Sequence, residues 1–351
     1  MKDSNGIGDD RSTATDGGTT RSPFEAISDV EETRRDRYRK RYETYVYAPL
    51  SIIWDDWRAR IGIAIIAFYV LVGTLGVYLI EPTSNLDGSA FIQPFETWEH
   101  PLGTDRMGRD LLADAVHSTR PMLIMMISGG LFTVSLGTAI GAVAGYKGGI
   151  TDTVLNSITD VFINIPGLPL VIVLSVMFEP RHPVMVGILL SVAAWAGLAR
   201  AIRSQVLTIR MESFTESARA MDIPTSRIIR KDVLPHLMPY LVINLMNAIR
   251  NIIFSAVGLY FLGVLPFEDQ NWGITLYAAY DQGAHYRPGA IHWLLIPMVA
   301  IIGISIGLIL LGQSLDRVFN PRVRARHENG GGEVDPEEDV DTDNTGMIKQ
   351  V

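Results

Sequence analysis

A stripe of polar side chains runs through a strongly apolar part of the sequence. Its members follow one another at intervals of four, three, four and four residues, and they are Tyr240, Asn244, Asn247, Asn251 and Ser255. This spacing places all of them on one face of an α-helix. Amides and hydroxyls donate and accept hydrogen bonds without carrying charge. The stripe therefore predicts either the lining of a path for a polar solute or hydrogen bonding between membrane helices.

Arg250 lies beside this stripe, near the middle of the same apolar run. An unpaired charge at that depth of a membrane is costly and usually faces protein or water. Two interpretations follow: Arg250 meets a carboxylate of a solute or of a partner chain, or it forms a structural ion pair. As a hypothesis, we assign the path to Asn244, Asn247, Arg250 and Asn251.

Two further groups of polar residues point to other chemistry. Asp160 lies in an apolar run and could act as a proton-relay carboxylate, but the simpler interpretation is a pair with a basic residue of a neighbouring segment. Asp110, Asp114 and His117 could share a helical face and offer metal ligands. We expect no metal there, because the string around Asp110 matches a different pattern that is described below.

Six apolar runs are long enough to hold these residues in a membrane. A hydrocarbon core of about 30 Å needs roughly 20 apolar residues per helix. The six runs are 61–80, 121–146, 154–178, 184–202, 237–265 and 291–313. Pro166 and Pro169 interrupt the third run and predict a kinked span. The expected fold class is an all-α polytopic membrane protein with six transmembrane helices.

The composition agrees with this class. Hydrophobic residues make up 48% of the chain, while 19% of the residues are charged and gather in the tails and between the apolar runs. The absence of cysteine excludes disulfides and thiolate metal sites. The net charge of −8 argues against nucleic acid as a partner. The acidic balance, with an excess of arginine over lysine, also fits a halophilic prokaryote.

Basic residues set the expected orientation. They cluster before the first run, between the fourth and fifth runs, and after the sixth run. Cytosolic loops carry the excess of lysine and arginine. We therefore expect a multi-pass protein of the cell membrane with both termini in the cytosol, and with the loops 81–120, 179–183 and 266–290 outside.

The basic loop between the fourth and fifth runs contains a short amphipathic helix. Phe214, Ala218 and Met221 recur at helical spacing, and Glu216 lies on the polar face. A charged helix has no place in hydrocarbon. The segment therefore predicts either a cytosolic docking element or a helix that lies on the lipid surface.

This loop resembles a motif of a known family. Glu216-Ser217-Ala218, with Asp222 six residues after the glutamate, is similar to the Glu-Ala-Ala motif of ATP-binding-cassette (ABC) importer permeases. Ser217 replaces an alanine, and Asp222 stands where the motif usually has glycine. In that family the motif's helix inserts into a groove of a cytosolic ATPase. The resemblance implies a coupling site made of Phe214, Glu216, Ser217, Ala218, Met221 and Asp222.

Other motifs narrow the resemblance to the second permease subunit of dipeptide and oligopeptide importers. They are HPLGTD at 100–105 with GRD at 108–110, AGY at 144–146, FLG at 261–263 with WG at 272–273, and LD at 315–316 with NPR at 320–322. Each motif is short, but their order and spacing over about 58–324 are specific. The resemblance implies a type I ABC importer permease fold.

The resemblance also implies partners. They are membrane lipid, a second homologous permease, two cytosolic ABC ATPases and an external substrate-binding protein. The chain has no Gly-x-x-x-x-Gly-Lys-Ser/Thr phosphate loop, so we expect no enzymatic activity and no cofactor here, with ATP and Mg²⁺ bound by the partner ATPases. Di- and oligopeptides are the expected substrates. Nickel complexes, oligosaccharides, a stand-alone secondary transporter and a non-transporting membrane anchor are the alternatives.

These inferences divide the chain into five parts. They are a cytosolic tail at 1–57, disordered over 1–30; a first transmembrane helix at 58–82; an extracytoplasmic segment at 83–120; a permease core of five helices at 121–315, with its coupling loop at 203–236; and an acidic cytosolic tail at 316–351.

Overall fold

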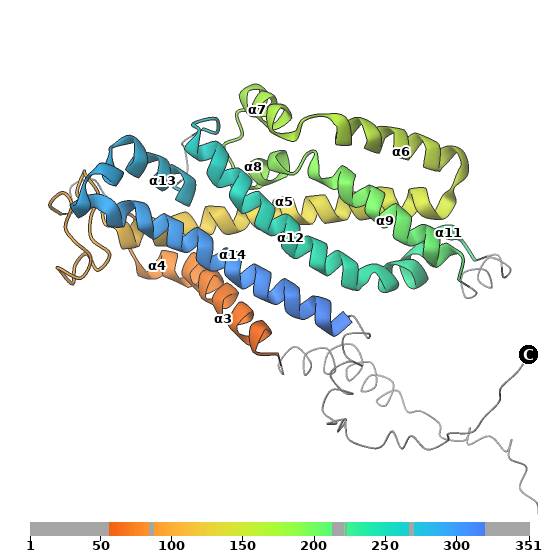
Figure 1. The fold of residues 1–351 in the computed structure, drawn as a ribbon, viewed down its shortest axis with the longest axis horizontal. Coiled ribbons are helices and arrows are strands. Elements are labelled where there is room, and N and C mark those ends of the chain that lie inside the picture. The colour runs from red at the N-terminus through yellow and green to blue at the C-terminus, as the bar shows by residue number, and fades with distance from the viewer. Residues whose placement is uncertain (1–55, 84–87, 213–220, 222, 267–269, 320–351) are drawn as a thin grey trace, which may run out of the picture. The chain divides into compact units, whose positions relative to one another are not determined.

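The computed structural model describes residues 56–83, 88–212, 221, 223–266 and 270–319, all within the unit Ser51–Val351 (Figure 1). Helices dominate these residues. The longer elements are α3 (Trp57–Leu71), α5 (Leu111–Lys147), α6 (Gly149–Asn164), α7 (Gly167–Phe178), α8 (Pro183–Leu190), α9 (Ala194–Arg210), α12 (Leu234–Phe261), α13 (Trp272–Asp281) and α14 (Ile291–Phe319). The short elements are the π-helical turns η2 (Val72–Gly76) and η3 (Ile229–Val233), the helices α4 (Val77–Leu79) and α11 (Thr225–Ile228), and the 3₁₀ turns η4 (Ala284–Tyr286) and η5 (Pro288–Ala290).

The count of membrane helices agrees with the sequence. Four helical stretches are long and apolar enough to cross a membrane, and they are Trp57–Leu79, Leu111–Lys147, Thr225–Phe261 and Pro288–Arg317. Two bent helix pairs, α6 with α7 and α8 with α9, raise the count to six if each pair is one span. Within the described ranges no strand forms, and one isolated bridge joins Thr104 to Asp110. The expected all-helical polytopic fold is confirmed.

The third predicted span is a broken helix rather than a kinked one. Ile165 is extended, Pro166 follows it, and the axes of α6 and α7 differ by 88°. Proline disfavours helical geometry in the residue before it, which explains the position of the break. In Figure 1, α6 lies along α9 while α7 turns away beside α8.

The fourth predicted span is also bent, by 56° between α8 and α9. Here no proline is involved. The Ser191 hydroxyl donates to the carbonyl oxygens of Gly187 and Ile188, at 2.8 and 2.9 Å. Serine bonds of this kind compete with the helical backbone and bend helices. The continuous apolar run 184–202 carried no sign of the bend.

Helix α5 begins earlier than the apolar run predicts. The run starts at Pro121, but the helix starts at Leu111 because the Asp110 carboxylate caps it, accepting from the backbone N–H groups of Leu112 and Ala113. A capping aspartate satisfies donors that the helix itself leaves unpaired. Pro121 lies inside the helix.

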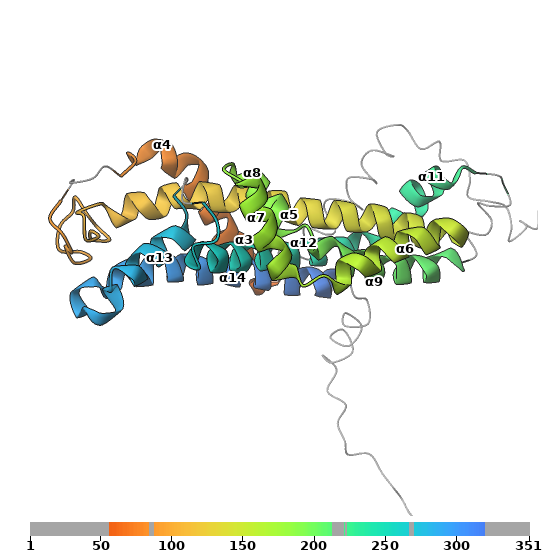
Figure 2. The same cartoon turned by 90° about the horizontal axis from the view of Figure 1, so that it is seen from above.

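Helix α5 is the central packing element, against which α8, α9 and α12 lie (Figures 1 and 2). Its contact with α9 depends on glycine. A Cβ atom at Gly141 would collide with the Ala199 carbonyl oxygen, and one at Gly145 would lie 2.8 Å from the Arg203 carbonyl oxygen. Glycine therefore brings the two helix backbones together, and this contact fixes the position of α9.

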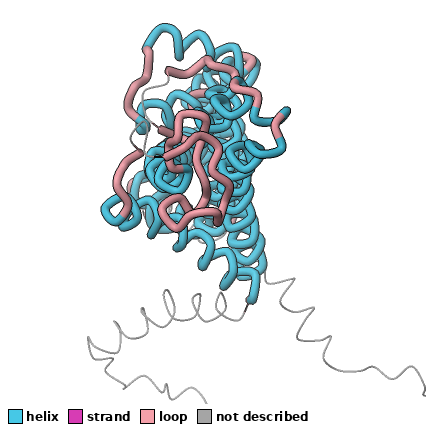
Figure 3. Tube along the Cα trace, turned by 90° about the vertical axis from the view of Figure 1, so that its left-hand side faces the viewer, coloured by secondary structure: helices cyan, strands magenta, loops and turns pink. Residues whose placement is uncertain are grey.

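Different segments lie at the two ends of the long helices. Figures 1 and 2 place the loop segment before α5 at one end and α11 at the other. Figure 3 looks onto the first of these ends, where loops gather over the helix termini. An external segment and a cytosolic loop must be separated in this way. Which end faces the cytosol stays a prediction.

Candidate functional site

The polar stripe of α12 lines a cavity of about 270 Å³ between α5, α8, α9 and α12. The helix is continuous over the stripe, so the intervals predicted from the sequence produce one face. Asn247 and Asn251 are exposed, whereas Asn244 and Ser255 are half-buried. The lining residues from α12 are Tyr240, Asn244, Asn247, Ala248, Asn251, Ile252 and Ser255. The structure thus brings together three of the four predicted path residues.

Two of the three amides in this stripe have no partner on another helix of the described chain. The Asn244 amide donates to the Tyr240 carbonyl oxygen of its own helix at 2.8 Å. In the described part of the chain, neither Asn247 nor Asn251 makes a hydrogen bond to another helix. Interhelical hydrogen bonding, the alternative interpretation of the stripe, is therefore not what these two side chains do within this chain.

The opposite wall of the cavity adds a buried hydroxyl that the sequence did not indicate. Thr133 on α5 is 4% exposed and lines the cavity, and its hydroxyl has no hydrogen-bond partner in the described part of the chain. A buried polar atom without a partner carries a desolvation cost. Small residues of α9, Ala194 and Gly197, leave the space in front of it open. Thr133 lies in a different apolar run from the stripe, so only the packing of α5 on α12 reveals it.

An apolar cavity of about 480 Å³ adjoins the polar one. The two share Leu190, Ala194, Gly197 and Ser255 in their linings. The break between α6 and α7 contributes Ile165 and Gly167 to the wall. A polar band and an apolar band therefore lie side by side, which suits a solute that has both kinds of surface.

Arg250 lies at the edge of the stripe and does not line either of these cavities. It is half-buried. None of the described residues forms an ion pair or hydrogen bond with it. A structural ion pair within the described part of the chain is thus not its role.

Two ion pairs join α6 to α9. Arg203 binds the Asp152 carboxylate through two nitrogen atoms, with Nη2 at 2.6 Å from Oδ2, and Arg200 binds Asp160. The prediction that Asp160 pairs with a basic residue of a neighbouring segment is confirmed. Because Arg200 holds the Asp160 carboxylate in this way, the pairing supports a structural role rather than a proton relay.

Most of the predicted coupling residues lie outside the described part of the chain. These are Phe214, Glu216, Ser217, Ala218 and Asp222. Met221 is described and is exposed in a turn. Both flanks of the segment are anchored, because Ile228 of α11 and Val233 of η3 pack in one buried cluster with Ile202 and Val206 of α9.

The fifth span does not begin with the apolar run 237–265, as the sequence predicted. Instead, α11, η3 and α12 form one stretch, Thr225–Phe261. Pro235 lies in the first turn of α12, directly after the π-helical turn. Since the stretch is continuous, Pro235 leaves one carbonyl oxygen of the preceding turn without its helical donor, and a π-helical turn is one of the places where the regular α-helical bonding is interrupted.

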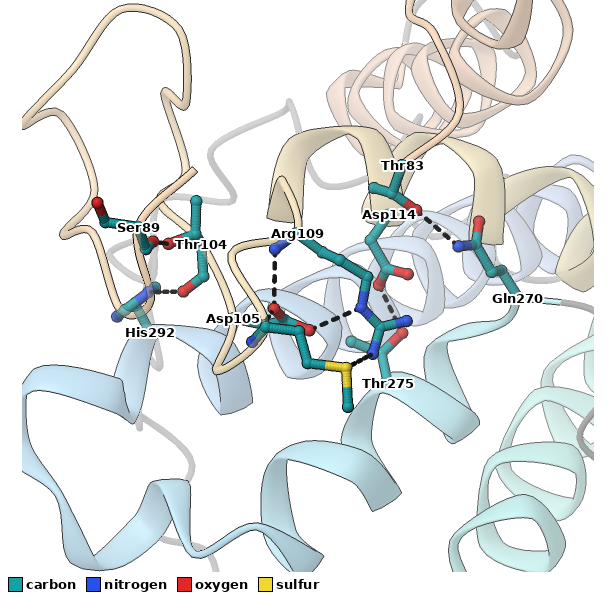
Figure 4. A network of polar contacts seen from close by, with 10 residues as sticks. Thr83, Ser89, Thr104, Asp105, Arg109, Asp114, Gln270, Thr275 and His292 are labelled. Carbon is teal, nitrogen blue, oxygen red and sulfur yellow. Dashed lines mark hydrogen bonds and ion pairs between the residues drawn. The ribbon is translucent and has the colours of Figure 1, made fainter. Parts of the chain in front are cut away.

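The segment before α5 folds around Asp105 and Thr104 (Figure 4). The Asp105 carboxylate accepts from the backbone N–H of Met107 at 2.7 Å, from the backbone N–H of Arg109 at 2.9 Å and from Arg109 Nε at 2.9 Å. The Thr104 hydroxyl donates to the Ser89 carbonyl oxygen at 2.6 Å and accepts from the Ile92 N–H at 2.9 Å. The HPLGTDRMGRD string is therefore a structural motif.

Three further contacts tie this end together. His292 Nε2 lies 3.2 Å from the Thr104 carbonyl oxygen, the Thr275 hydroxyl donates to Asp114 at 2.6 Å, and Gln270 donates to Thr83 at 2.8 Å (Figure 4). They connect the segment before α5 to α14, helix α5 to α13, and Thr83 to the residues before α13. Asp114, which we considered as a metal ligand, is thus engaged with a hydroxyl.

The other two residues of that group also have different roles. Asp110 caps α5, and His117 Nε2 lies 2.9 Å from the Ile80 carbonyl oxygen. No group of three or more histidine, cysteine, aspartate or glutamate side chains that could hold a metal ion occurs among the residues that the structure describes.

Comparisons with known proteins place the chain in a family. Residues 137–325 match the model of the binding-protein-dependent transport system inner membrane component. A dipeptide transport system permease protein of Bacillus subtilis is 30% identical over 288 residues, which are 78% of this chain and 87% of the relative. An oligopeptide transport system permease protein of Haemophilus influenzae is 28% identical over 64% of this chain and 75% of its own length.

A solved structure is also similar. It shows inward-facing conformations of the MetNI methionine ABC transporter, is 19% identical, has a TM-score of 0.45, and covers 57% of this chain and 96% of its own. The family assignment rests on the two sequence matches: the family model covers more than half of the chain, and the Bacillus relative matches over most of both chains. The chain belongs to the family of inner-membrane components of binding-protein-dependent transport systems.

Proposed function

We propose that this chain is one permease subunit of an ATP-driven importer of di- and oligopeptides, and that the stripe of α12 borders the path. The relatives that match most of the chain carry the names of dipeptide and oligopeptide permeases. The observation that carries the proposal is the cavity in which Asn244, Asn247 and Asn251 present neutral amides. Amides pair with peptide N–H and C=O groups whatever the side chains of the peptide.

A second permease subunit would complete this path. Asn247 and Asn251 are exposed on a helix that is long enough to cross a membrane, and polar side chains that face lipid are costly. Phe254 and Gly258 extend the same exposed face along the helix. A homologous subunit packed here would cover the amides and enclose the cavity between two halves. It could also bring a carboxylate to Arg250.

The segment between α9 and α11 is the proposed contact with the ATPases. Its flanks are held in the cluster that contains Ile202, Ile228 and Val233. A helix that moves with an ATPase groove would therefore displace α9 and α12 together, and both border the cavity. The ATPases would bind ATP and Mg²⁺, and an external binding protein would deliver substrate at the opposite end.

The path assignment is tested with the chain assembled with its partner subunits in proteoliposomes. Leucine in place of both Asn247 and Asn251 keeps the side-chain size and removes hydrogen bonding. We expect uptake of a radiolabelled peptide to fall about tenfold, equivalent to about 1.4 kcal/mol. Met238→Leu, at an exposed position of the same helix that does not line the cavity, is the control. Full uptake by the double variant would show that the stripe does not border the path.

Arg250→Gln separates the two partners proposed for the guanidinium. If Arg250 binds a peptide carboxylate, uptake of peptides with a free C-terminus falls while uptake of C-terminally amidated peptides is unchanged. An equal loss for both kinds of peptide would assign Arg250 to a carboxylate of the second permease instead.

The coupling assignment is tested by Glu216→Arg and Ala218→Arg, with co-purification of the ATPases as the measurement. We expect both variants to lose the ATPases, while Glu212→Arg, outside the motif, keeps them. Unchanged assembly and uptake would contradict a coupling helix.

Two results would favour the alternative functions. Proton-driven uptake by the chain alone would favour a secondary transporter, and competition by nickel complexes or oligosaccharides would change the substrate class.

A further inference from the structure

An apolar groove opens between α3, α5 and α14, at the end where the segment before α5 lies. Its volume is about 440 Å³, which is within the range of about 300–1,000 Å³ found for ligand sites. Almost all of its lining is apolar, and it includes Tyr69, Val72, Val116, Ile296 and Val299. The groove is separate from the two cavities beside α12.

The groove exists because α3 changes its packing partner along its length. Near its start, α3 lies against α14, where a Cβ atom at Gly62 would be 2.9 Å from the Gly307 carbonyl oxygen. Beyond its end, the π-helical turn η2 packs on α5, with Gly73 near Leu123 and Gly76 near Val116. The space between α3, α5 and α14 remains open as a wedge. Single π-helical turns inside longer helices often occur at functional sites.

Both ends of the wedge are closed by specific contacts. At one end, the Tyr69 hydroxyl donates to the Ala300 carbonyl oxygen at 2.9 Å. At the other end, Pro94 and Leu102 of the segment before α5 contribute to the lining. These contacts hold the helices at a fixed separation, so the groove does not need a guest to stay open.

The mouth of the groove faces hydrocarbon. Phe68 on α3 and Leu295 and Val299 on α14 line it and are 59%, 46% and 65% exposed. Both helices belong to stretches that are long and apolar enough to cross a membrane. Lipid therefore surrounds the mouth. A volume of about 440 Å³ is that of about one turn of an α-helix with a diameter of about 10 Å and a pitch of about 5.4 Å, so the groove suits a single hydrocarbon chain better than a partner helix.

One polar side chain in the lining has a nitrogen atom that is not paired. His292 is 6% exposed, and its Nδ1 atom has no hydrogen-bond partner among the residues that the structure describes. Its Nε2 atom faces the Thr104 carbonyl oxygen (Figure 4), and in the tautomer with the proton on Nε2, which this contact favours, Nδ1 is an acceptor. A buried acceptor of this kind requires a donor. A hydroxyl at the polar end of a lipid would supply one.

We propose that this groove binds one acyl chain of a glycerophospholipid whose head group bears a hydroxyl, and that this hydroxyl donates to His292 Nδ1. His292 would then link the lipid hydroxyl to the Thr104 carbonyl oxygen. The lipid would in this way add one hydrogen bond to the network that folds the segment before α5. The site depends on membrane insertion alone and not on the substrate or the coupling mechanism.

The site is tested by photolabelling of the full chain in phosphatidylcholine vesicles. The probe is phosphatidylglycerol with a diazirine in one acyl chain, and the adducts are mapped by mass spectrometry. We expect adducts to concentrate on Phe68, Leu295 and Val299. Ala115→Phe, which fills the groove from α5, should lower this labelling about tenfold. Ala139→Phe, on an exposed position of the same helix, should leave it unchanged.

A second arm tests the role of His292. At a fixed amount of probe and of total lipid, vesicles in which part of the phosphatidylcholine is replaced by unlabelled phosphatidylglycerol, which has hydroxyls, should give less labelling than vesicles of phosphatidylcholine, which has none. His292→Phe should abolish this difference, and His292→Gln, which keeps an acceptor, should restore part of it. Equal labelling of the unaltered chain in the two kinds of vesicle would contradict the hydrogen bond to Nδ1.

Other outcomes would overturn the site itself. Adducts spread evenly over all lipid-facing helices of the unaltered chain would do so, and this measurement stands even if Ala115→Phe does not fold. Loss of the labelling when the chain is assembled with its partner subunits would show that a neighbouring protein, rather than lipid, covers the groove.

Discussion

The two ends of the helices are held together by polar contacts of different kinds. In the segment before α5, Asp105 is 3% exposed and accepts three hydrogen bonds. At the other end, Arg200 and Asp160 pair with 51% and 42% of their side chains exposed. Buried charge-assisted bonds are costly to break because each donor left behind loses its only partner. Exposed pairs are weak and are screened by salt.

This difference indicates where the protein can move. The end with the buried network holds one geometry, because a shift of Asp105 leaves donors of Met107 and Arg109 unsatisfied. The exposed pairs at the opposite end have fewer buried groups to leave unsatisfied, so they separate at a lower cost. Motion imposed by a partner on the segment between α9 and α11 would therefore reach the cavity more easily than motion from the opposite end.

The largest expected effect is that of removing the centre of the buried network. Asp105→Ala leaves two backbone donors and the Arg109 guanidinium without their acceptor, so we expect the free energy of unfolding to fall by about 3 kcal/mol. Chemical denaturation of the purified chain in detergent measures it. Glu99→Ala, an exposed position of the same segment, is the control. Equal stability of the two variants would remove the contrast between the ends.

A smaller effect is expected from a variant that tests the packing of α5 against α9. It asks whether close backbone contact, rather than the ion pairs, holds the helices together at the opposite end. Gly141→Ala places a Cβ atom against the Ala199 carbonyl oxygen, and we expect a loss of about 2 kcal/mol from overpacking. Gly197→Ala is matched to it, because no atom lies within 4 Å of the new Cβ. That variant should be neutral or stabilising by about 0.5–1 kcal/mol. A stable Gly141→Ala variant would mean that α5 and α9 can separate.

The Arg203–Asp152 pair should contribute less to the free energy of unfolding than the Asp105 network or the packing at Gly141. Its side chains are 30% and 19% exposed, and its two-point geometry favours the upper part of the range for such pairs, about 1 kcal/mol. A double-mutant cycle with Arg203→Gln and Asp152→Asn measures the coupling energy. The value should decrease when the salt concentration rises from 0.05 to about 0.5 M. A coupling energy that is independent of salt would show that this pair resembles the buried network.

The smallest effect is expected for Arg200 and Asp160. Because both side chains are about half exposed, a cycle with Arg200→Gln and Asp160→Asn should give about 0.3 kcal/mol. A coupling energy above that of Arg203–Asp152 would reverse the expected order of the two ion pairs. The stronger of the two would then be the one nearer the break between α6 and α7.

Features that depend on one stretch of sequence could be predicted. The apolar runs marked the helices, Pro166 marked the break, and the spacing of Asn244, Asn247 and Asn251 marked one face of α12. Each of these follows from local geometry: the length needed to cross a membrane, the ring of proline, and the period of the helix.

Features that depend on packing could not be predicted. Thr133 joins the cavity only because α5 crosses α12, and the bend at Ser191 depends on a side-chain bond within an otherwise apolar run. The Asp105 network did have a signal in the sequence. Gly103 and Gly108 have φ angles of 81° and 78°, which favour glycine, and they flank the aspartate at a spacing typical of tight turns.

The π-helical turn η3 has a consequence for the direction of the stripe. Each residue advances an α-helix by about 100°, so one extra residue in a turn rotates everything beyond it by that angle. Ile228 is fixed in the buried cluster before the turn, and Asn244 follows after it. The number of residues in Ile229–Val233 therefore determines the direction in which the asparagine side chains point around the axis of α12. A one-residue deletion there would turn intact asparagines away from the cavity, although no residue of the stripe had changed.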